Sequence, residues 1–448
     1  MLIQAAGMQI DLGDVAHRSF VYFLGCWLFA IMVISLLRTI VVPRALRSFI
    51  SGSVMSGVVS GAWMIARIRK NYRARDSVMA WAGPLIIIMT LLTWLIGFVL
   101  AYGCMIYGLS GQSFGQSLAQ SGSSLFTLGF DAGVGQSQTI IDFLAAATGP
   151  IVIALMIGFL PTIYSIYTER EVAVTRLSTQ AGEPAWGPEL LTRAQLGEQL
   201  AGIDVMFIEW TKWAAALRLT HLTYPSLIYV RSARAYRHYA TSMLAMMDAA
   251  ALSVSLTHER EHHEAFEFLA QGVQTLDTLY LTSIGRRRWF SKLPALGKIL
   301  SSNTKIGSDA IAMPARDAGR TAVQLAASAD AVRGLEPETL GLLDFGEGRP
   351  LQLTRHEFDE AYAMLNAAEY PIEYAPDAAW EMFRRLRQRY EFAAYAICSK
   401  LDAPPAPWSG TRRVKTETIS PARALDYYEK PVTRDADTVI DDIEVPEA

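Results

Sequence analysis

The segment SFGQSLAQSGSSLFTLGFD, residues 113–131, consists of small, polar and apolar residues and contains no Lys or Arg. It lies between two long hydrophobic runs, residues 81–107 and 140–167. Each run is long enough to cross the roughly 30 Å hydrocarbon core of a bilayer. Irregular backbone at membrane depth needs cover from other protein or a watery path. The pattern therefore predicts two membrane-spanning helices with one re-entrant loop between them.

The end of this segment, Thr127-Leu128-Gly129-Phe130, resembles the Thr-Val-Gly-Tyr start of the potassium-channel selectivity filter. Residues 123–126 resemble the end of the pore helix that precedes the filter. The resemblance covers residues 81–167 and implies the bacterial potassium-channel-like superfamily, whose tetrameric cation channels have two transmembrane helices and a pore loop. Asp131 departs from the family pattern, which has a second Gly there. Either that Gly is substituted, or one residue is lost and Asp131 matches the acidic residue after the filter.

The resemblance also implies roles for particular residues. Backbone carbonyls at 127–130 coordinate a dehydrated K⁺ or Na⁺, and Gly129 supplies the φ freedom that the carbonyl arrangement needs. An aromatic residue such as Phe130 wedges the filter against the pore helix, and Asp131 is a candidate acidic ring at the outer mouth. Gly158 and Pro161 resemble the hinge of the inner helix. A static kink is the alternative for these two residues, and a Gly- and Ser-rich external loop is the alternative for the filter.

The composition separates a membrane part from a soluble part. The 448 residues are 51% hydrophobic, but the charged residues are concentrated in the last two thirds. A net charge of −3 argues against nucleic acid as the main partner. The three cysteines are far apart and form neither a disulfide framework nor a metal-binding motif.

Charge bias predicts the topology. Residues 1–19 lack the basic region of a cleavable signal, and residues 20–42 form a first span. The linker 43–79 carries seven basic residues against one acid and is therefore cytoplasmic. We predict an external N-terminus, three spans and a cytoplasmic C-terminal region in the inner (plasma) membrane. Within the linker, residues 49–66 have small residues every four positions and are interpreted as an interfacial helix, with a fourth span as the rival.

The remainder predicts a cytoplasmic all-α domain over residues 182–410 and a disordered acidic tail over 411–448. Residues 239–256 are apolar enough for a span, but their Ala content and Asp248 favour a buried bundle helix. The candidate helices of this domain are 189–219, 234–256, 260–283, 310–331, 355–368 and 377–403. The fold class is thus an all-α membrane protein with a helical cytoplasmic domain.

One enzyme motif is present by pattern alone. His258, Glu259 and His262 match HExxH, which on a helix binds zinc. The match lies in a polar run without a third ligand, so we interpret it as a solvated helix face. His221 is interpreted as part of a packed turn near the membrane surface. The chain is predicted to be neither an enzyme nor dependent on a cofactor.

Two function classes remain. The first is a gated, homotetrameric cation channel, because one pore loop per chain needs four chains to close a carbonyl ring. The second is a non-conducting membrane anchor or sensor whose helical domain binds a cytoplasmic partner that the sequence does not identify.

Overall fold

The computed structural model describes residues 12–41, 48–131, 133, 135–257, 262–284 and 351–410. Helices and turns make up this part of the chain, which contains no strand. The helices of the N-terminal part are α1 (Leu12–Leu36) with the π-helical turn η1 (Leu37–Val41), α2 (Phe49–Ala66), α3 (Tyr72–Ala80), α4 (Ala82–Leu109), α5 (Phe114–Leu125) and α6 (Gln136–Ala181). The C-terminal part has α7 (Gly187–Leu196), η2 (Leu200–Gly202), α8 (Ile203–Thr223), η3 (Pro225–Tyr229), α9 (Tyr239–Leu256), α10 (His263–Ile284), α14 (Arg355–Ala367), α15 (Pro376–Arg387) and α16 (Glu391–Leu401).

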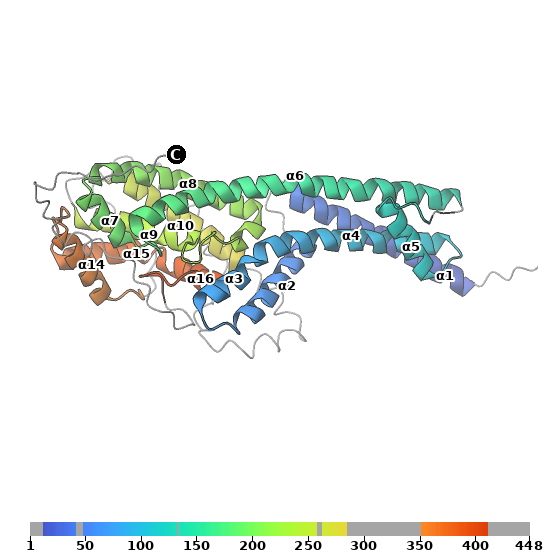
Figure 1. The fold of residues 1–448 in the computed structure, drawn as a ribbon, viewed down its shortest axis with the longest axis horizontal. Coiled ribbons are helices and arrows are strands. Elements are labelled where there is room, and N and C mark those ends of the chain that lie inside the picture. The colour runs from blue at the N-terminus through green and yellow to red at the C-terminus, as the bar shows by residue number, and fades with distance from the viewer. Residues whose placement is uncertain are drawn as a thin grey trace, which may run out of the picture.

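The molecule is elongated, with a narrow arm of α1, α4, α5 and α6 attached to a wider helical domain (Figure 1). Within the arm α1 and α4 pack closely because glycines bring their backbones together. A Cβ on Gly25 would lie 2.7 Å from the carbonyl oxygen of Ala101, and one on Gly97 would lie 2.5 Å from the sulfur of Met32. The two helices therefore run antiparallel in close contact.

Several helices are long and apolar enough to cross a membrane. By length and composition these segments are Gly13–Val41, Phe49–Ala66, Tyr72–Leu109, Gln136–Ala181 and Tyr239–Leu256. The prediction of a helical fold with several long apolar helices is confirmed for the residues that the structure describes. The helices extend beyond the predicted spans, since α1 begins at Leu12 rather than residue 20 and α4 ends at Leu109.

Helix α2 has the predicted bounds, 49–66. It begins beside the end of α1, where the Ser35 and Ser48 hydroxyls are 2.7 Å apart and the Thr39 and Ser51 hydroxyls are also 2.7 Å apart. From there α2 runs towards the helical domain rather than back along α1 (Figure 1). Met55 joins the core of that domain. Helix α2 therefore lies at the junction of the arm and the domain.

Helix α6 differs most from the prediction. The sequence places the end of the inner helix at residue 167, but α6 continues to Ala181 without interruption. Its 46 residues correspond to about 69 Å at 1.5 Å per residue. Val174, Leu177 and Ala181 are buried in the core of the helical domain. The polar residues from Glu169 to Glu171 thus lie within one helix that joins the arm to the domain.

Helix α9 is the centre of the helical domain, because every residue from Tyr239 to Leu256 is buried. Small alanine side chains allow neighbouring helices to approach it on all sides. Its one acid, Asp248, is bonded to the buried Arg387 of α15 and to the hydroxyl of Tyr390 at 2.8 Å. Helix α9 is therefore buried inside this domain, as predicted from its Ala content.

Other helix boundaries were predicted too broadly. The predicted helix 189–219 is divided after α7, where Gly197 caps the helix and Glu198 has a positive φ of 55°. The predicted helix 377–403 is divided into α15 and α16 by a turn at 388–390. Helix α9 starts at Tyr239 rather than residue 234. The predicted helix 310–331 and the acidic tail lie outside the described residues.

Candidate functional site

The re-entrant segment contains a short helix, α5, which starts at a well-formed cap. The Ser113 hydroxyl accepts from the backbone N–H of Gln116 at 3.4 Å, and the Gln116 side chain accepts from the backbone N–H of Ser113 at 3.1 Å. This reciprocal pair satisfies N–H groups that the first turn of any helix leaves open. The local sequence therefore fixes where α5 begins after α4 ends.

Helix α5 packs against both α4 and α6 (Figure 1). Its polar residues Ser117, Gln120, Ser121 and Ser123 are buried, and the Ser121 hydroxyl donates to the Val99 carbonyl of α4 at 2.9 Å. Because these groups bond within the protein, a polar helix is accommodated in the arm.

Glycines bring α5 close to both neighbours. A Cβ on Gly103 of α4 would lie 2.6 Å from the Leu118 side chain, and one on Gly149 of α6 would lie 1.9 Å from the Leu125 carbonyl oxygen. Only hydrogen at these two positions leaves room for α5. Its position is therefore set by contacts on both sides.

The end of α5 has a defined left-handed cap. Thr127 has φ 54°, its N–H donates to the Ser124 carbonyl at 3.0 Å, and the Leu128 N–H donates to the Ser123 carbonyl at 2.8 Å. This pair of bonds is the Schellman pattern that ends many helices. Gly129 also has a positive φ, 73°, with negative values at Leu128 and Phe130. The sign of φ thus alternates from Thr127 to Phe130.

The residues that resemble the filter are exposed in the single chain. Residues 126–130 are all exposed, with Leu128 at 64% and Phe130 at 69%. A Cβ on Gly129 would meet nothing within 4 Å. Phe130 therefore does not wedge against α5 of its own chain, contrary to the packing expected for it.

Asp142 at the start of α6 holds the segment that follows. Its carboxylate accepts from the Ser124 hydroxyl at 2.8 Å, from the Gln120 amide at 3.0 Å and from the Gly133 N–H at 2.9 Å. The N–H of Asp131 donates to the Ser123 hydroxyl at 3.1 Å. Sequence analysis did not single out Asp142. The sequence feature that could have identified Asp142 is its position as an isolated acid in an apolar run, because acidic residues within membrane helices usually have a function.

The end of α5 and the segment that follows it present oxygen acceptors. The carbonyl end of α5 carries the negative end of the helix dipole, equivalent to roughly half an elementary charge. It is followed by the exposed backbone of residues 127–130 and by the carboxylate of Asp131. Arg and Lys are absent from residues 108–139. The groups gathered here are carbonyl oxygens and carboxylates, which are typical ligands of hard cations.

The predicted hinge residues, Gly158 and Pro161, lie within uninterrupted α6. A Cβ on Gly158 would meet nothing within 4 Å. A hollow of about 470 Å³ lies beside it, lined by apolar side chains that include Ile151, Leu155 and Phe159. The side of α6 that carries Gly158 is therefore open, whereas the adjacent Phe159 packs against Tyr224 with ring centroids 5.6 Å apart.

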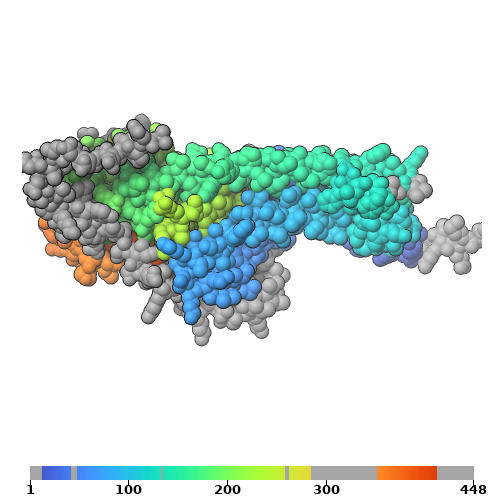
Figure 2. All heavy atoms as spheres, viewed as in Figure 1, coloured from blue at the N-terminus to red at the C-terminus, as the bar shows by residue number. Residues whose placement is uncertain are grey.

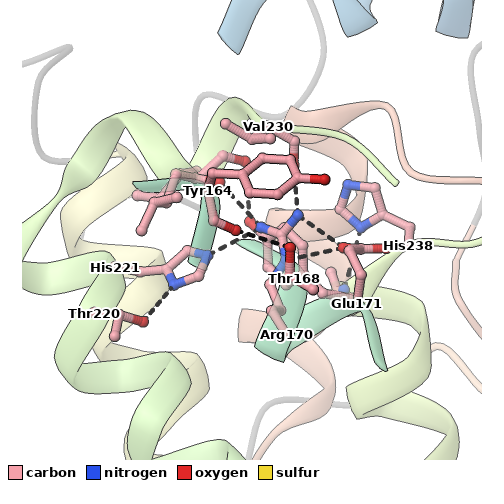
Figure 3. Close-up of polar contacts among 12 residues, drawn as sticks. Tyr164, Thr168, Arg170, Glu171, Thr220, His221, Val230 and His238 are labelled. Atoms are coloured by element: carbon pink, nitrogen blue, oxygen red, sulfur yellow. Dashed lines mark hydrogen bonds and ion pairs between the residues drawn. The ribbon is translucent and has the colours of Figure 1, made fainter. Parts of the chain in front are cut away.

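Arg170 connects α6 to the helical domain (Figure 3). Its guanidinium donates to the carbonyls of Leu227 at 3.1 Å and Val230 at 2.8 Å and pairs with Glu171 at 2.8 Å. The group lies 4.6 Å from the ring centroid of Tyr239. Arg170 is buried, so these contacts compensate for the loss of hydration.

The same segment touches α4. A Cβ on Gly83 would lie 2.8 Å from the Val230 side chain, so the start of α4 packs directly on the residue whose carbonyl binds Arg170. His221 was predicted to lie in a packed turn, but it is buried within α8, which ends at Thr223, and η3 then begins at Pro225. The contact with both α4 and α6 depends on the tertiary structure.

His221 is buried beside Arg170, with its Nε2 3.2 Å from the guanidinium Nη1. Arg only donates hydrogen bonds, so Nε2 accepts and the proton of the neutral ring lies on Nδ1, 3.2 Å from the Thr220 hydroxyl. Burial, together with the charge of Arg170, lowers the pKa of His221 well below its ordinary value. His221 is therefore a neutral acceptor for Arg170.

The HExxH pattern lies mostly outside the described residues. His258 and Glu259 are not among them, and His262 has its Nε2 2.9 Å from the Thr257 carbonyl oxygen. Among the described residues no group of three or more His, Cys, Asp or Glu side chains is placed to hold a metal ion.

The described residues form a helical fold in which several helices are long and apolar enough to cross a membrane, with a short capped helix packed against two of them. No protein-family model, curated protein or solved structure matches the chain.

Proposed function

We propose that the chain forms a homotetrameric cation channel that conducts K⁺ or Na⁺ along the backbone of residues 127–130. The observation that carries this proposal is the placement of α5. Its polar face is bonded to α4 and α6, and its carbonyl end leads into an exposed segment whose φ is positive at Thr127 and Gly129. Exposure of the Leu128 and Phe130 side chains to water costs free energy in a single chain. Neighbouring chains around a symmetry axis would cover these side chains.

Electrostatics support the same proposal. Four α5 helices pointing their carbonyl ends at one axis would contribute roughly two negative charges, taking half a charge from each helix. Asp131 would add a ring of carboxylates next to that axis. Such a ring attracts cations and has no evident use in an anchor. The proposed topology has the N-terminus and residues 108–139 outside and the helical domain in the cytoplasm.

The proposed gate lies on α6. Gly158 and Pro161 are both exposed on α6, and Pro161 has no N–H to bond the preceding turn. Because α6 continues into the helical domain, a movement of that domain would reach the gate through the same helix. Arg170 is the residue that ties the two together.

The deciding experiment is cation flux through liposomes containing the purified full-length protein. Gly129→Ala should abolish or greatly reduce flux, because a left-handed conformation with a Cβ costs about 1–2 kcal/mol per residue in each of four subunits. Gly122→Ala is the matched control, since Gly122 lies in α5 and a Cβ there meets nothing within 4 Å. Flux equal to that of empty liposomes for wild type, despite correct insertion, would reject the channel and favour the membrane anchor with a partner-binding domain.

Native mass measurement and labelling test the remaining parts of the proposal. The detergent-solubilised protein should be a tetramer, and a stable monomer or dimer would contradict a shared axis. A cysteine at Gln136 should react from outside and one at Ser77 only from inside. The reverse pattern would contradict the proposed orientation.

A further inference from the structure

A polar hollow of about 440 Å³ lies where α3 meets the helical domain. Figure 2 shows the blue surface of α2 and α3 meeting the yellow-green surface of the domain on this side of the molecule. The charged and polar residues that line the hollow are Arg73, Asp76 and Ser77 of α3, Glu183 after α6, and Arg234 and Tyr236 before α9. Its volume is within the range of small-molecule sites, about 300–1,000 Å³.

Both carboxylates of the hollow already have arginine partners. Asp76 pairs with the buried Arg231, which also bonds the Asp402 carbonyl at 3.2 Å. Glu183 accepts from the Nε of Arg237 at 2.6 Å. These two acids are therefore neutralised by arginines that do not line the hollow.

The two arginines that do line the hollow are less well compensated. Arg73 lies over the ring of Tyr236, 5.2 Å from its centroid, and has no carboxylate partner among the described residues. Arg234 is 68% exposed and lies 3.6 Å from the Glu183 carboxylate, which is beyond a normal hydrogen bond. Four guanidinium groups thus surround two carboxylates, and the excess positive charge is at Arg73 and Arg234.

We propose that this hollow binds a small phosphate-bearing anion, held by Arg73 and Arg234. Guanidinium groups form paired, charge-assisted hydrogen bonds with phosphate oxygens, and an anion here would meet two such groups from different segments of the chain. The Ser77 hydroxyl lines the same hollow. The phosphate belongs either to a soluble metabolite or to the headgroup of an anionic lipid.

The position of the site gives the anion a structural effect. α3 is separated from α4 only by Trp81, and Glu183 follows the last residue of α6 by two positions. An anion held by Arg73 and Arg234 would bridge α3, which leads into α4, and the segment before α9, whose Arg234 lies 3.6 Å from Glu183. An effect on a gate rests on the proposed channel function, whereas binding itself does not.

The test is calorimetric titration of the full-length protein in detergent with pyrophosphate. Wild type should bind, and Arg73→Gln and Arg234→Gln should each weaken binding about ten- to a hundredfold, because a hydrogen bond to a charged group contributes about 1.5–3 kcal/mol. Arg385→Gln is the matched control. Arg385 is also 68% exposed and pairs with Glu381 on α15, so its replacement should leave binding unchanged.

Nanodiscs distinguish the two sources of phosphate. If phosphatidylglycerol, but not phosphatidylcholine, competes with pyrophosphate in the wild-type protein, the anion is a lipid headgroup. Equal pyrophosphate affinity in both lipids assigns the site to a soluble phosphate, and either result supports the proposal. Absence of binding by wild type, or binding that both glutamine variants retain, would overturn it. Pyrophosphate binding is measured without ion conduction. A negative binding result would therefore reject the anion site without rejecting the channel.

Discussion

Replacing Gly149 with Ala tests the position of α5 against α6. A Cβ at this site would lie 1.9 Å from the carbonyl oxygen of Leu125, whereas real Cβ contacts are essentially never under 3.0 Å. The helices would have to separate by at least the difference, 1.1 Å. The obstructing atom belongs to the backbone, so rotation of a side chain cannot relieve the contact.

The expected loss of stability follows from two opposing effects. Overpacking of a closely packed interior costs about 1–3 kcal/mol, and a clash with backbone belongs to the upper part of that range. Ala is the better helix former by about 1 kcal/mol, which offsets part of the cost. A net loss of about 2 kcal/mol lowers the unfolding temperature by about 4–8 °C in a domain of 150–250 residues, and by less in a longer chain.

Circular dichroism of the detergent-solubilised full-length protein measures this change, because the described chain is helical throughout its regular structure. Gly158→Ala is the control, since Gly158 lies on the same helix and a Cβ there meets nothing within 4 Å. The control should unfold at the wild-type temperature or slightly above it. If Gly149→Ala is as stable as Gly158→Ala, α5 does not approach α6 as described.

Three further predictions concern the polar contacts. The pKa of His221 is lowered in the folded state, so the unfolded state binds more protons below pH 6.5. The free energy of unfolding should therefore fall as the pH falls below 6.5, by up to about 1.4 kcal/mol per pH unit. In urea titrations, His221→Gln should lack this part of the pH dependence. Asp248→Ala removes one of the two carboxylates that pair with the buried Arg387 and leaves Glu391 as the other, so it should cost about 1.5–3 kcal/mol in urea unfolding; a smaller loss for the double variant Asp248→Ala/Arg387→Met would identify the reduced compensation of the Arg387 charge as the cause. Asp142→Ala removes the acceptor of the Gly133 N–H, so hydrogen exchange at that amide should accelerate by the equivalent of about 1.5–3 kcal/mol, and unchanged exchange would contradict the anchoring role of Asp142.

The sequence by itself determined the helical class, the apolar segments and several local boundaries. Helix α2 has the predicted bounds because its ends are marked by the polar residues that flank an apolar run. Helix α9 was recognised as a bundle helix because Ala and a single acid favour burial in protein over exposure to lipid. The cap of α5 at Ser113 is likewise a local pattern. These features depend on residues within a few positions of each other, so the local sequence is sufficient to predict them.

Only the tertiary structure decided how the arm and the domain are joined. In the sequence, the charged residues 169–171 predict the end of a membrane span. In the structure α6 continues through them, because the Arg170 side chain forms hydrogen bonds with His221, Leu227 and Val230. These partners lie 51, 57 and 60 residues further along the chain. Likewise, the importance of Gly149 depends on the carbonyl of Leu125, which only folding brings beside it. Hydropathy and helical periodicity report what each segment prefers locally, whereas these contacts depend on which segments meet in space.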